Sequence, residues 1–367
     1  MAFFHQPNYL FIFRPLKNKR EIDIIIVGQG LAGSALALRA TERGLRTFVL
    51  DRPSENRSSR IAAGMFNPVT GRKMSKTWLA DELFPSLFKY YQRAEEITGQ
   101  KFFYPTRMYR PFLSVGEQNE WMGKSADPSF RPFIAKLSAV SLYPGKVNDE
   151  FGGLTLDQAG YLDTRVYLDA IRAHLESQNS FSEETFDADA LQISERGVTY
   201  KDLQAQKIVF CQGVQNASNA WFSDVPVNSL KGEFITVQSD WENDVILNRG
   251  VYMVRGHRQN EWRVGSTYNR DDHSEGITDQ ARKELIGKLE ELICMPYRVT
   301  GQQWGVRPTS PDRKPIMGAH PKYSSLIIFN GFGTKGVSLA PYFSEVLIRS
   351  MENKGTISKE ADVSRFY

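Results

Sequence analysis

A glycine-rich segment near the N-terminus constrains the fold of this chain more than any other part of its sequence. An apolar run at 24–27 leads into residues 28–33, whose sequence is GQGLAG. A helical segment follows, and a second apolar run at 47–50 ends at Asp51. This order of strand, glycine motif, helix, strand and acid is typical of a βαβ unit that binds an adenine dinucleotide. The sequence therefore predicts a Rossmann-like unit of the α/β class at 23–51.

Each glycine of this motif has its own expected role. Gly28 permits the tight turn off the strand, Gly30 lets the backbone approach a pyrophosphate, and Gly33 lets the helix pack close to the strand. The helix N-terminus offers unpaired N–H groups and a positive dipole end to the phosphates. Asp51 is suited to accept from both hydroxyls of an adenosine ribose, or to cap a neighbouring turn. The predicted cofactor contacts here are Gly28, Gly30, Leu31, Ala32, Gly33, Asp51 and Arg52.

Length and apolar periodicity predict two interleaved domains. A chain of 367 residues exceeds one comfortable hydrophobic core. Apolar spacing predicts helices at 81–99, 164–178 and 280–293, strands at 207–211, 231–237, 251–255 and 262–265, and mainly sheet across 102–143. We expect residues 1–20 to be an extension outside the fold. The expected domains are a discontinuous cofactor-binding domain at 21–84, 152–225 and 302–367, and a substrate domain at 85–151 and 226–301.

The composition does not indicate a nucleic-acid partner, a metal site or a membrane span. The formal net charge of +4 is too small to indicate nucleic acid by itself. The two cysteines, Cys211 and Cys294, lie far apart, without the spacing of a zinc site or a disulfide framework. The N-terminal residues lack the apolar run of a signal peptide, and no segment approaches the run of about 18 apolar residues that spans a membrane. We therefore expect a cytoplasmic protein without a metal.

A basic stretch occupies residues 52–80, where Glu55 is the only acid. Two interpretations fit this pattern: a solvated surface, or a loop that faces phosphates or an acidic substrate. The basic residues beyond Arg52 are Arg57, Arg60, Arg72, Lys73 and Lys76.

Four further motifs follow the glycine segment. Residues 304–318, WGVRPTSPDRKPIMG, are similar to an RPxxPDxxPxIG signature, and residues 330–341, NGFGTKGVSLAP, form a glycine-rich turn that opens a helix. Residues 62–65, AAGM, are similar to a flavin-side loop, and Gly213 lies where a second glycine motif falls. Together these motifs resemble the D-amino-acid-oxidase-like family of FAD-dependent oxidoreductases, which includes glycine and sarcosine oxidases.

The resemblance implies a glutathione-reductase-type FAD-binding domain joined to a substrate domain with a large antiparallel or mixed sheet. It also implies noncovalent FAD, because relatives with covalent flavin attach it through a Cys or a His at the positions that hold Gly305 and Ile61 here. The N–H groups of the last glycine turn then face the site where a reduced flavin accumulates negative charge. The implied flavin contacts are Ala62, Ala63, Gly64, Met65, Gly213, Gly331, Gly333, Thr334, Lys335 and Gly336.

The resemblance implies oxidation of a C–N bond by hydride transfer from the substrate α-carbon to flavin N5, leaving an imine that water hydrolyses. Arg307 is the expected carboxylate-binding residue, because a planar guanidinium binds a carboxylate bidentately, and an ion pair with Asp312 is the alternative. Tyr252 either joins that carboxylate or packs in the core. Lys335 either contacts the flavin and assists oxygen chemistry or faces solvent. The candidates expected at the surface are His257 and His273.

The leading functional hypothesis is a FAD-dependent oxidase or dehydrogenase of a small primary or secondary amine or amino acid that bears a carboxylate. Oxygen or an electron carrier would accept the electrons. One alternative is the trimming of a carboxymethylaminomethyl group on tRNA wobble uridine, because the turn at 331–341 also resembles the FAD domain of that enzyme. A noncatalytic flavin-binding module is the other alternative.

Overall fold

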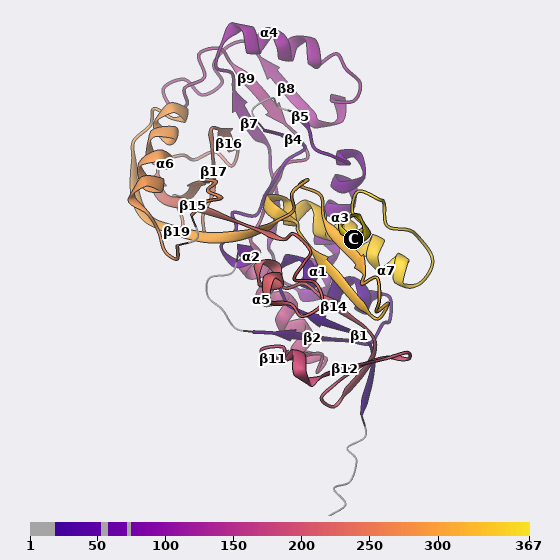
Figure 1. Ribbon diagram of the computed structural model, residues 1–367. Coiled ribbons are helices and arrows are strands. Elements are labelled where there is room, and N and C mark those ends of the chain that lie inside the picture. Colours follow the sequence, from indigo (N-terminus) through magenta and orange to yellow (C-terminus); the bar gives the residue numbers. More distant parts are fainter. Residues whose placement is uncertain (1–18, 53–57, 72–74, 273) are drawn as a thin grey trace, which may run out of the picture.

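The computed structural model of this protein describes residues 19–52, 58–71, 75–272 and 274–367. Two large sheets organise these residues, one in the lower part of Figure 1 and one in its upper part. None of the described helices is both long and apolar enough to cross a bilayer. The predicted extension at 1–20 lies outside the described residues except for its last two positions, and Arg20 opens the first strand.

The first sheet is mainly parallel and contains the predicted βαβ unit. Its strands follow the order β11-β2-β1-β14-β13-β12, and β21 pairs with both β14 and β20. The pairs among β11, β2, β1, β14 and β21 are parallel, whereas β12, β13 and β20 join antiparallel. The strands are β1 (Arg20–Val27), β2 (Thr47–Asp51), β11 (Phe181–Glu183), β12 (Leu191–Ser194), β13 (Gly197–Tyr200), β14 (Leu203–Phe210), β20 (Ile316–Ala319) and β21 (Leu326–Asn330).

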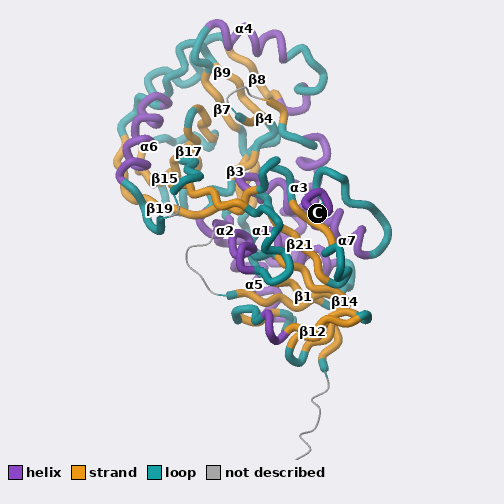
Figure 2. The backbone as a smooth tube through the Cα atoms, in the orientation of Figure 1, coloured by secondary structure: helices purple, strands orange, loops and turns teal. Residues whose placement is uncertain are grey.

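Long helices share a core with one face of this sheet. Successive residues of β1 enter two different cores, because Ile24 and Ile26 pack with the helices while Ile25 and Val27 pack on the opposite face. Figure 2 shows these helices, in purple, beside the strands of the lower sheet. They are α1 (Leu31–Glu42), α3 (Ala80–Thr98), α5 (Thr164–Ser177) and α7 (Gly336–Met351). The predicted helices at 81–99 and 164–178 are confirmed to within one residue.

The second sheet is mixed, and a helix covers one of its faces. Its strand order is β19-β15-β18-β17-β16-β7-β9-β8, in which β16 and β7 pair in parallel. Leu285 and Leu289 of α6 (Asp279–Leu292) pack in one core with Ile235 and Trp262, which confirms the helix predicted at 280–293. The strands are β7 (Met108–Pro111), β8 (Ile134–Ser138), β9 (Gly153–Leu156), β15 (Asn228–Ser239), β16 (Ile246–Arg249), β17 (Val251–Arg255), β18 (Glu261–Gly265) and β19 (Tyr297–Thr309).

The stretch at 102–143 contains a helix that the sequence did not predict. Strands β6 (Phe103–Pro105), β7 and β8 are present, but α4 (Val115–Lys124) lies between β7 and β8. The hydroxyl of Ser114 caps α4 by accepting from the N–H of Glu117 at 3.2 Å. Trp121 is the buried residue of this helix, so it shows no apolar periodicity. The expectation of sheet across this stretch is therefore wrong for α4.

Short elements complete the described structure. Strand β9 and part of β19 belong to the second sheet although they fall inside the predicted cofactor-domain segments, so the domain boundaries stay a prediction. The remaining strands are β3 (Met65–Phe66), β4 (Val69–Thr70), β5 (Ser75–Lys76) and β10 (Gly160–Leu162). The short helices are α2 (Ser58–Ile61), η1 (Arg131–Phe133), η2 (Ala188–Ala190), η3 (Gly213–Ser218), η4 (Gly333–Lys335) and η5 (Val363–Phe366).

Candidate active site

The glycine motif forms a turn with no room for a side chain at two positions. Gly28 has a φ of +103°, and a Cβ there would lie 2.6 Å from the carbonyl oxygen of Cys211, just after β14. A Cβ at Gly33 would overlap the carbonyl oxygen of Gly28. Both obstacles are backbone atoms, which cannot move without separating α1 from the sheet. The tight turn at Gly28 and the close helix packing at Gly33 are thereby confirmed.

The N-terminus of α1 faces a hydroxyl of α2. The N–H of Leu31 donates to Ser59 Oγ at 3.1 Å, and a Cβ on Gly30 would lie 3.0 Å from the same oxygen. The first N–H groups of a helix attract oxygen ligands in this way. The space in front of α1 therefore fits an oxygen-bearing group, and the approach of a pyrophosphate to Gly30 stays a prediction.

Asp51 ends β2 beside the glycine turn. Its Oδ1 accepts from the N–H of Gln29 at 2.9 Å, so the carboxylate does cap the neighbouring turn. A cavity of about 320 Å³ opens at the next residue, Arg52, and its lining also includes Phe186 and Trp221. Aromatic side chains of this kind can stack on a planar base. The ribose contact of Asp51 and the cofactor contact of Arg52 stay predictions that this cavity supports.

The last glycine-rich turn lies against the first. Gly331 and Gly333 have φ values of +74° and +54°, so the chain turns sharply after β21 before α7 begins at Gly336. A Cβ at Gly336 would lie 3.1 Å from Leu31 Cδ1 of α1. The N-termini of α1 and α7 are therefore neighbours, and their positive dipole ends favour an anionic group between them. This geometry fits the flavin contacts predicted for this turn, including Thr334.

The end of β19 joins these glycine turns to the second sheet. Pro308 Cγ lies 3.7 Å from the Cβ position of Gly213. One residue further, Thr309 forms an antiparallel bridge with Phe332 of the last glycine turn. Arg307 directly precedes both contacts, so the structure places it beside the segments predicted to hold the flavin.

The flavin-side loop reaches the second sheet. Gly64 has a φ of +71°, and a Cβ there would overlap the carbonyl oxygen of Leu162. The amide of Asn248 on β16 approaches Met65 Sδ at 3.7 Å, and Ala63 and Met65 pack in the same cluster as Tyr252. The loop therefore lies between the two sheets, where a cofactor that contacts both would lie.

Arg307 is half-buried and is held by the loop that follows β18. Its guanidinium donates to Ser266 Oγ at 2.7 Å and to the Thr267 carbonyl at 3.3 Å. It occupies the space above Gly232, where a Cβ would lie 2.5 Å from its Cζ atom. The ring of Tyr268, which is 63% exposed, stacks on it with 4.9 Å between Cζ and the ring centre. The guanidinium is thus fixed in one orientation without using a carboxylate.

The ion pair considered between Arg307 and Asp312 does not form. Asp312 pairs instead with Arg365, at 3.0 Å between Oδ2 and Nε. Among the described residues, no acidic side chain forms an ion pair with Arg307. This alternative is therefore wrong, and the guanidinium remains available to a carboxylate of a ligand.

Tyr252 shares a sheet face with Arg307. The strand register places Gly232 and Phe234 of β15, Gly265 of β18 and Tyr252 on the face opposite α6. Burial raises the pKa of Tyr252 to about 12, and the positive charges of Arg307 and Arg263 oppose that shift. Tyr252 therefore keeps its proton at neutral pH and can donate a hydrogen bond. Tyr252 therefore lies on the same sheet face as Arg307, and its contact with a substrate carboxylate stays a prediction.

Lys335 lies at the start of α7 and is half-buried rather than facing solvent. Its Nζ lies 3.5 Å from Thr70 Oγ1. Burial, followed by the neighbouring charges of Arg313 and Lys314, lowers the pKa of Lys335. Lys335 is therefore only partly exposed to solvent, and its predicted contact with the flavin stays a prediction.

Sequence reasoning missed a chain of three polar residues beside the flavin-side loop. Arg263 on β18 donates to the Ala62 carbonyl at 3.0 Å and also contacts His257 Nε2. His257 Nδ1 in turn lies 3.0 Å from Oδ2 of Asp163, which caps α5. His257 is at the surface as expected, yet it has two partners. The sequence feature that could have indicated this chain is Arg263, a charged residue inside the apolar strand predicted at 262–265.

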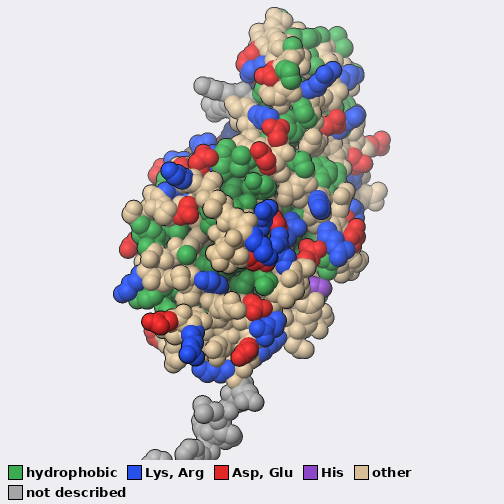
Figure 3. All heavy atoms as spheres, turned by 90° about the vertical axis from the view of Figure 1, so that its right-hand side faces the viewer, with side chains coloured by type: hydrophobic (Ala, Val, Ile, Leu, Met, Phe, Trp, Pro, Cys, Tyr) green, Lys and Arg blue, Asp and Glu red, His purple; other side chains and the backbone are tan. Residues whose placement is uncertain are grey.

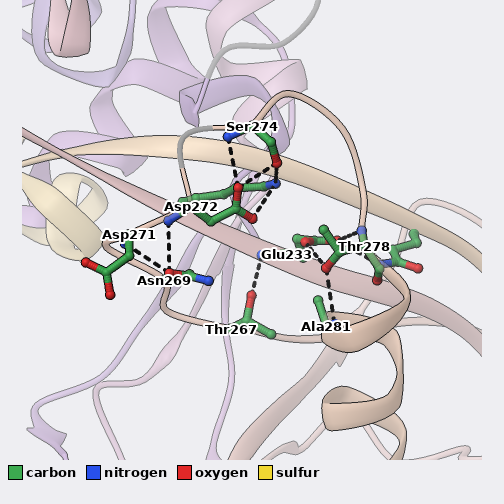
Figure 4. A network of polar contacts seen from close by, with 10 residues as sticks. Glu233, Thr267, Asn269, Asp271, Asp272, Ser274, Thr278 and Ala281 are labelled. Atoms are coloured by element: carbon green, nitrogen blue, oxygen red, sulfur yellow. Dashed lines mark hydrogen bonds and ion pairs between the residues drawn. The ribbon is translucent and has the colours of Figure 1, made fainter.

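A polar network fixes the loop that holds Arg307. Glu233 is buried, and its carboxylate accepts from the N–H and hydroxyl of Thr278 at 2.9 and 2.8 Å. The N–H of Glu233 donates to Thr267 Oγ1 at 2.9 Å, and Lys231 pairs with Asp272 at 2.7 Å. Figure 4 shows these contacts tying both ends of the loop to β15. The Thr267 carbonyl that accepts from Arg307 is therefore held in place.

Two described residues of the basic stretch pair with acids. Arg60 lies 2.5 Å from Asp169, and Lys76 lies 2.6 Å from Asp81. These pairs fit the interpretation as a solvated surface. The other predicted residues of this kind, together with one histidine candidate, lie outside the described residues: Arg57, Arg72, Lys73 and His273.

Residues 23–349 match the DAO family, described as FAD dependent oxidoreductase. The chain is similar to the bifunctional protein ThiO/ThiG of Synechocystis sp., with 24% identity over 87% of this chain and 50% of that protein. It is also similar to the tRNA 5-methylaminomethyl-2-thiouridine biosynthesis bifunctional protein MnmC of Legionella pneumophila, with 22% identity over 94% of this chain and 55% of that protein. The chain spans about half the length of these curated relatives.

The fold is also found in a solved structure. Glycine oxidase from Geobacillus kaustophilus matches with a TM-score of 0.74 at 18% identity, over 94% of this chain and 98% of that one. This likeness confirms the predicted class, a two-domain α/β fold with a Rossmann-like sheet and a large mixed sheet. Because the family match extends over most of the sequence, this protein belongs to the DAO family of FAD-dependent oxidoreductases.

Proposed function

We propose that this protein oxidises the C–N bond of a small primary or secondary amine or amino acid that bears a carboxylate, with FAD as the hydride acceptor. The observation that carries the proposal is Arg307. It is a half-buried guanidinium with no acidic partner among the described residues, beside the glycine turns that suit a flavin. A guanidinium in such a setting binds a carboxylate bidentately. Membership of the DAO family and the likeness to a glycine oxidase support this proposal.

In this proposal the chain supplies binding and orientation. Arg307 fixes the substrate carboxylate, and the protonated hydroxyl of Tyr252 donates to it, because both residues lie on one face of the second sheet. FAD, when bound, supplies the acceptor for the hydride. Holding the substrate carbon in one place is what such a reaction needs from its protein. Lys335 would contact the flavin, and oxygen or an electron carrier would accept the electrons.

We propose noncovalent FAD. Gly305 and Ile61 occupy the two positions at which relatives attach flavin covalently, and neither residue has a nucleophilic side chain. Ile61 Cδ1 also fills the space where a Cβ of Gly305 would lie. Denaturation with acid should therefore release all the flavin absorbance into the supernatant. Flavin that stays with the precipitated protein would contradict this. The proposed contacts are Gly28, Gly30, Leu31, Ala32, Gly33, Asp51, Arg52, Ala62, Ala63, Gly64, Met65, Gly213, Gly331, Gly333, Thr334, Lys335 and Gly336.

We also propose a cytoplasmic location. Buried Cys211 and exposed Cys294 are both free thiols, which is typical of a reducing compartment. Fractionation of cells that express the full chain would test this, and recovery from an oxidising compartment would contradict it.

The central experiment is flavin bleaching under nitrogen. The FAD-loaded protein is mixed with a panel of amino acids and N-alkyl glycines, and the loss of flavin absorbance is followed. Arg307→Met should weaken reduction by the active substrate by about 10- to 100-fold, the cost of losing a charged hydrogen bond, while FAD content stays unchanged. Arg298→Met is the matched control, because Arg298 is an exposed residue of the same strand. Equal loss of FAD and of substrate reduction in Arg307→Met would refute the assignment.

A second candidate function is action on a modified wobble uridine of tRNA. The similarity to MnmC, which covers 94% of this chain, favours it. Basic and acidic side chains are interspersed over the face in Figure 3, with one basic group near its centre. Retention of tRNA on a filter that weakens steeply with salt would support this candidate. Absence of retention at low salt would remove it.

A further inference from the structure

A buried guanidinium on β7 keeps most of its N–H groups unpaired, and the proposed function gives it no role. Arg110 is 5% exposed. Its one hydrogen bond to the described residues runs from Nη2 to the Gly71 carbonyl at 3.2 Å, and its buried Nε has no acceptor. Buried donors almost always have a partner, because an unpaired donor loses its bonds to water without replacement. Arg110 therefore lacks an acceptor.

The charge around Arg110 is not balanced by its neighbours. Burial, followed by the charge of Arg249 on β16, lowers the pKa of Arg110 to about 10, and Glu117 of α4 opposes this shift. The Glu117 carboxylate is already engaged, because Oε1 pairs with Arg249 at 2.7 Å and Oε2 accepts from the N–H of Leu113 at 2.8 Å. The three side chains together carry two positive charges and one negative charge. One positive charge is left over, and such a charge is costly in a buried place.

Arg110 lies far from the guanidinium proposed to bind the substrate carboxylate. Met108 of β7 packs in the cluster that includes Tyr252, whereas Tyr109 packs in the cluster of α6. Side chains alternate along a strand, so Arg110 lies on the face opposite α6, as Met108 does. Strands β18, β17 and β16 separate β7 from β15, above which Arg307 lies, so the two strands are about 19 Å apart. The unpaired groups of Arg110 are therefore separate from the carboxylate site.

We propose that Arg110 binds a small monovalent inorganic anion, of which chloride is the simplest. A monovalent anion supplies the single missing negative charge and accepts from the free N–H groups of the guanidinium. It thereby fixes the guanidinium that holds the Gly71 carbonyl, just after β4. The bound ion then joins the second sheet to the segment that follows the flavin-side loop. This inference is independent of the proposed function, because it involves neither flavin nor substrate.

The thermal midpoint of the FAD-loaded protein tests the proposal, measured while chloride replaces gluconate at constant ionic strength. An anion that binds only the folded protein raises the midpoint in a saturable way. We expect this rise in the native protein and its loss in Arg110→Gln, which keeps a donor for the Gly71 carbonyl but has no charge. Glu117→Gln should instead reach half-saturation at about tenfold lower chloride, because one nearby negative charge is removed.

Two control variants leave the groups around Arg110 unchanged. Arg307→Met removes the guanidinium of the proposed substrate site, and Arg107→Met removes an exposed arginine that pairs with Asp157 at 3.0 Å just before β7. Both variants should keep the rise. A rise lost in Arg307→Met, kept in Arg110→Gln or absent from the native protein would overturn the proposal. If Arg110→Gln does not fold, Glu117→Gln decides, because an unchanged half-saturation there would equally overturn it.

Discussion

Replacing Gly232 by alanine should displace the Arg307 guanidinium and leave the fold intact. A Cβ on Gly232 would lie 2.5 Å from Arg307 Cζ, closer than such atoms approach in proteins. The atoms that must move are the far end of a flexible side chain, so rotation of Arg307 relieves the overlap without separating the strands. That rotation breaks the hydrogen bonds to Ser266 Oγ at 2.7 Å and to the Thr267 carbonyl at 3.3 Å. The guanidinium then no longer meets the substrate carboxylate in the proposed geometry.

The magnitude follows from the contact that is lost. A hydrogen bond to a charged group contributes about 1.5–3 kcal/mol, so kcat/KM should fall by about 10- to 100-fold. Steady-state kinetics measure this fall, while FAD content and the thermal midpoint should stay at the native values. Gly301→Ala on β19 is the matched control, because a Cβ there would lie 3.7 Å from Thr236, an ordinary contact. An unchanged kcat/KM in Gly232→Ala would refute the role of Arg307.

Three further predictions concern packing, pH and the phenol. Gly33→Ala should lower the free energy of unfolding by about 1–3 kcal/mol, because the new Cβ overlaps backbone atoms. Chemical denaturation measures this loss. Gly123→Ala in α4, where a Cβ would have no atom within 4 Å, should not lower the free energy of unfolding. The hydrogen bond from Lys231 lowers the pKa of Asp272 to about 2. The charged carboxylate therefore stabilises the folded protein above the ordinary carboxyl pKa of about 4. This stabilisation is lost as pH falls through about 2. Acid unfolding followed by circular dichroism should therefore be less steep over this window in Asp272→Asn. Tyr252→Phe should raise KM by about 2- to 10-fold, the equivalent of one neutral hydrogen bond, and a parallel loss of FAD would indicate a packing role instead.

Local sequence patterns predicted the parts of the structure that depend on neighbours along the chain. The helices α3, α5 and α6 agree with their predicted ranges to within one residue because each has apolar residues at helical spacing. The roles of Gly28 and Gly33 were predictable because a tight turn and a close helix leave no space for a side chain. The family motifs singled out Arg307 as the carboxylate-binding residue, and this role stays a prediction.

The remaining features depend on contacts between residues far apart in the sequence. Asp163 and His257 are separated by 94 positions, and nothing in either local segment indicates that they meet. Gly232 lies in a predicted strand, but the register between β15 and β19 is needed to see that it leaves space for the Arg307 guanidinium. Arg263 was recognisable only as a charge inside an apolar run. Tertiary pairing, and not local propensity, determines these three features.

Strand β19 explains why the glycine fingerprint and the proposed site of reaction are different places. The fingerprint packs at the carboxyl end of β1, where it would anchor the far end of the cofactor. Most of β19 pairs with β15 in the second sheet, while its last residue, Thr309, bridges to the last glycine turn. One continuous strand thus fixes Arg307 relative to both sheets. Substitutions in the fingerprint should therefore change stability and FAD content together, whereas substitutions on the face of the second sheet should change substrate binding in a protein that still holds its flavin.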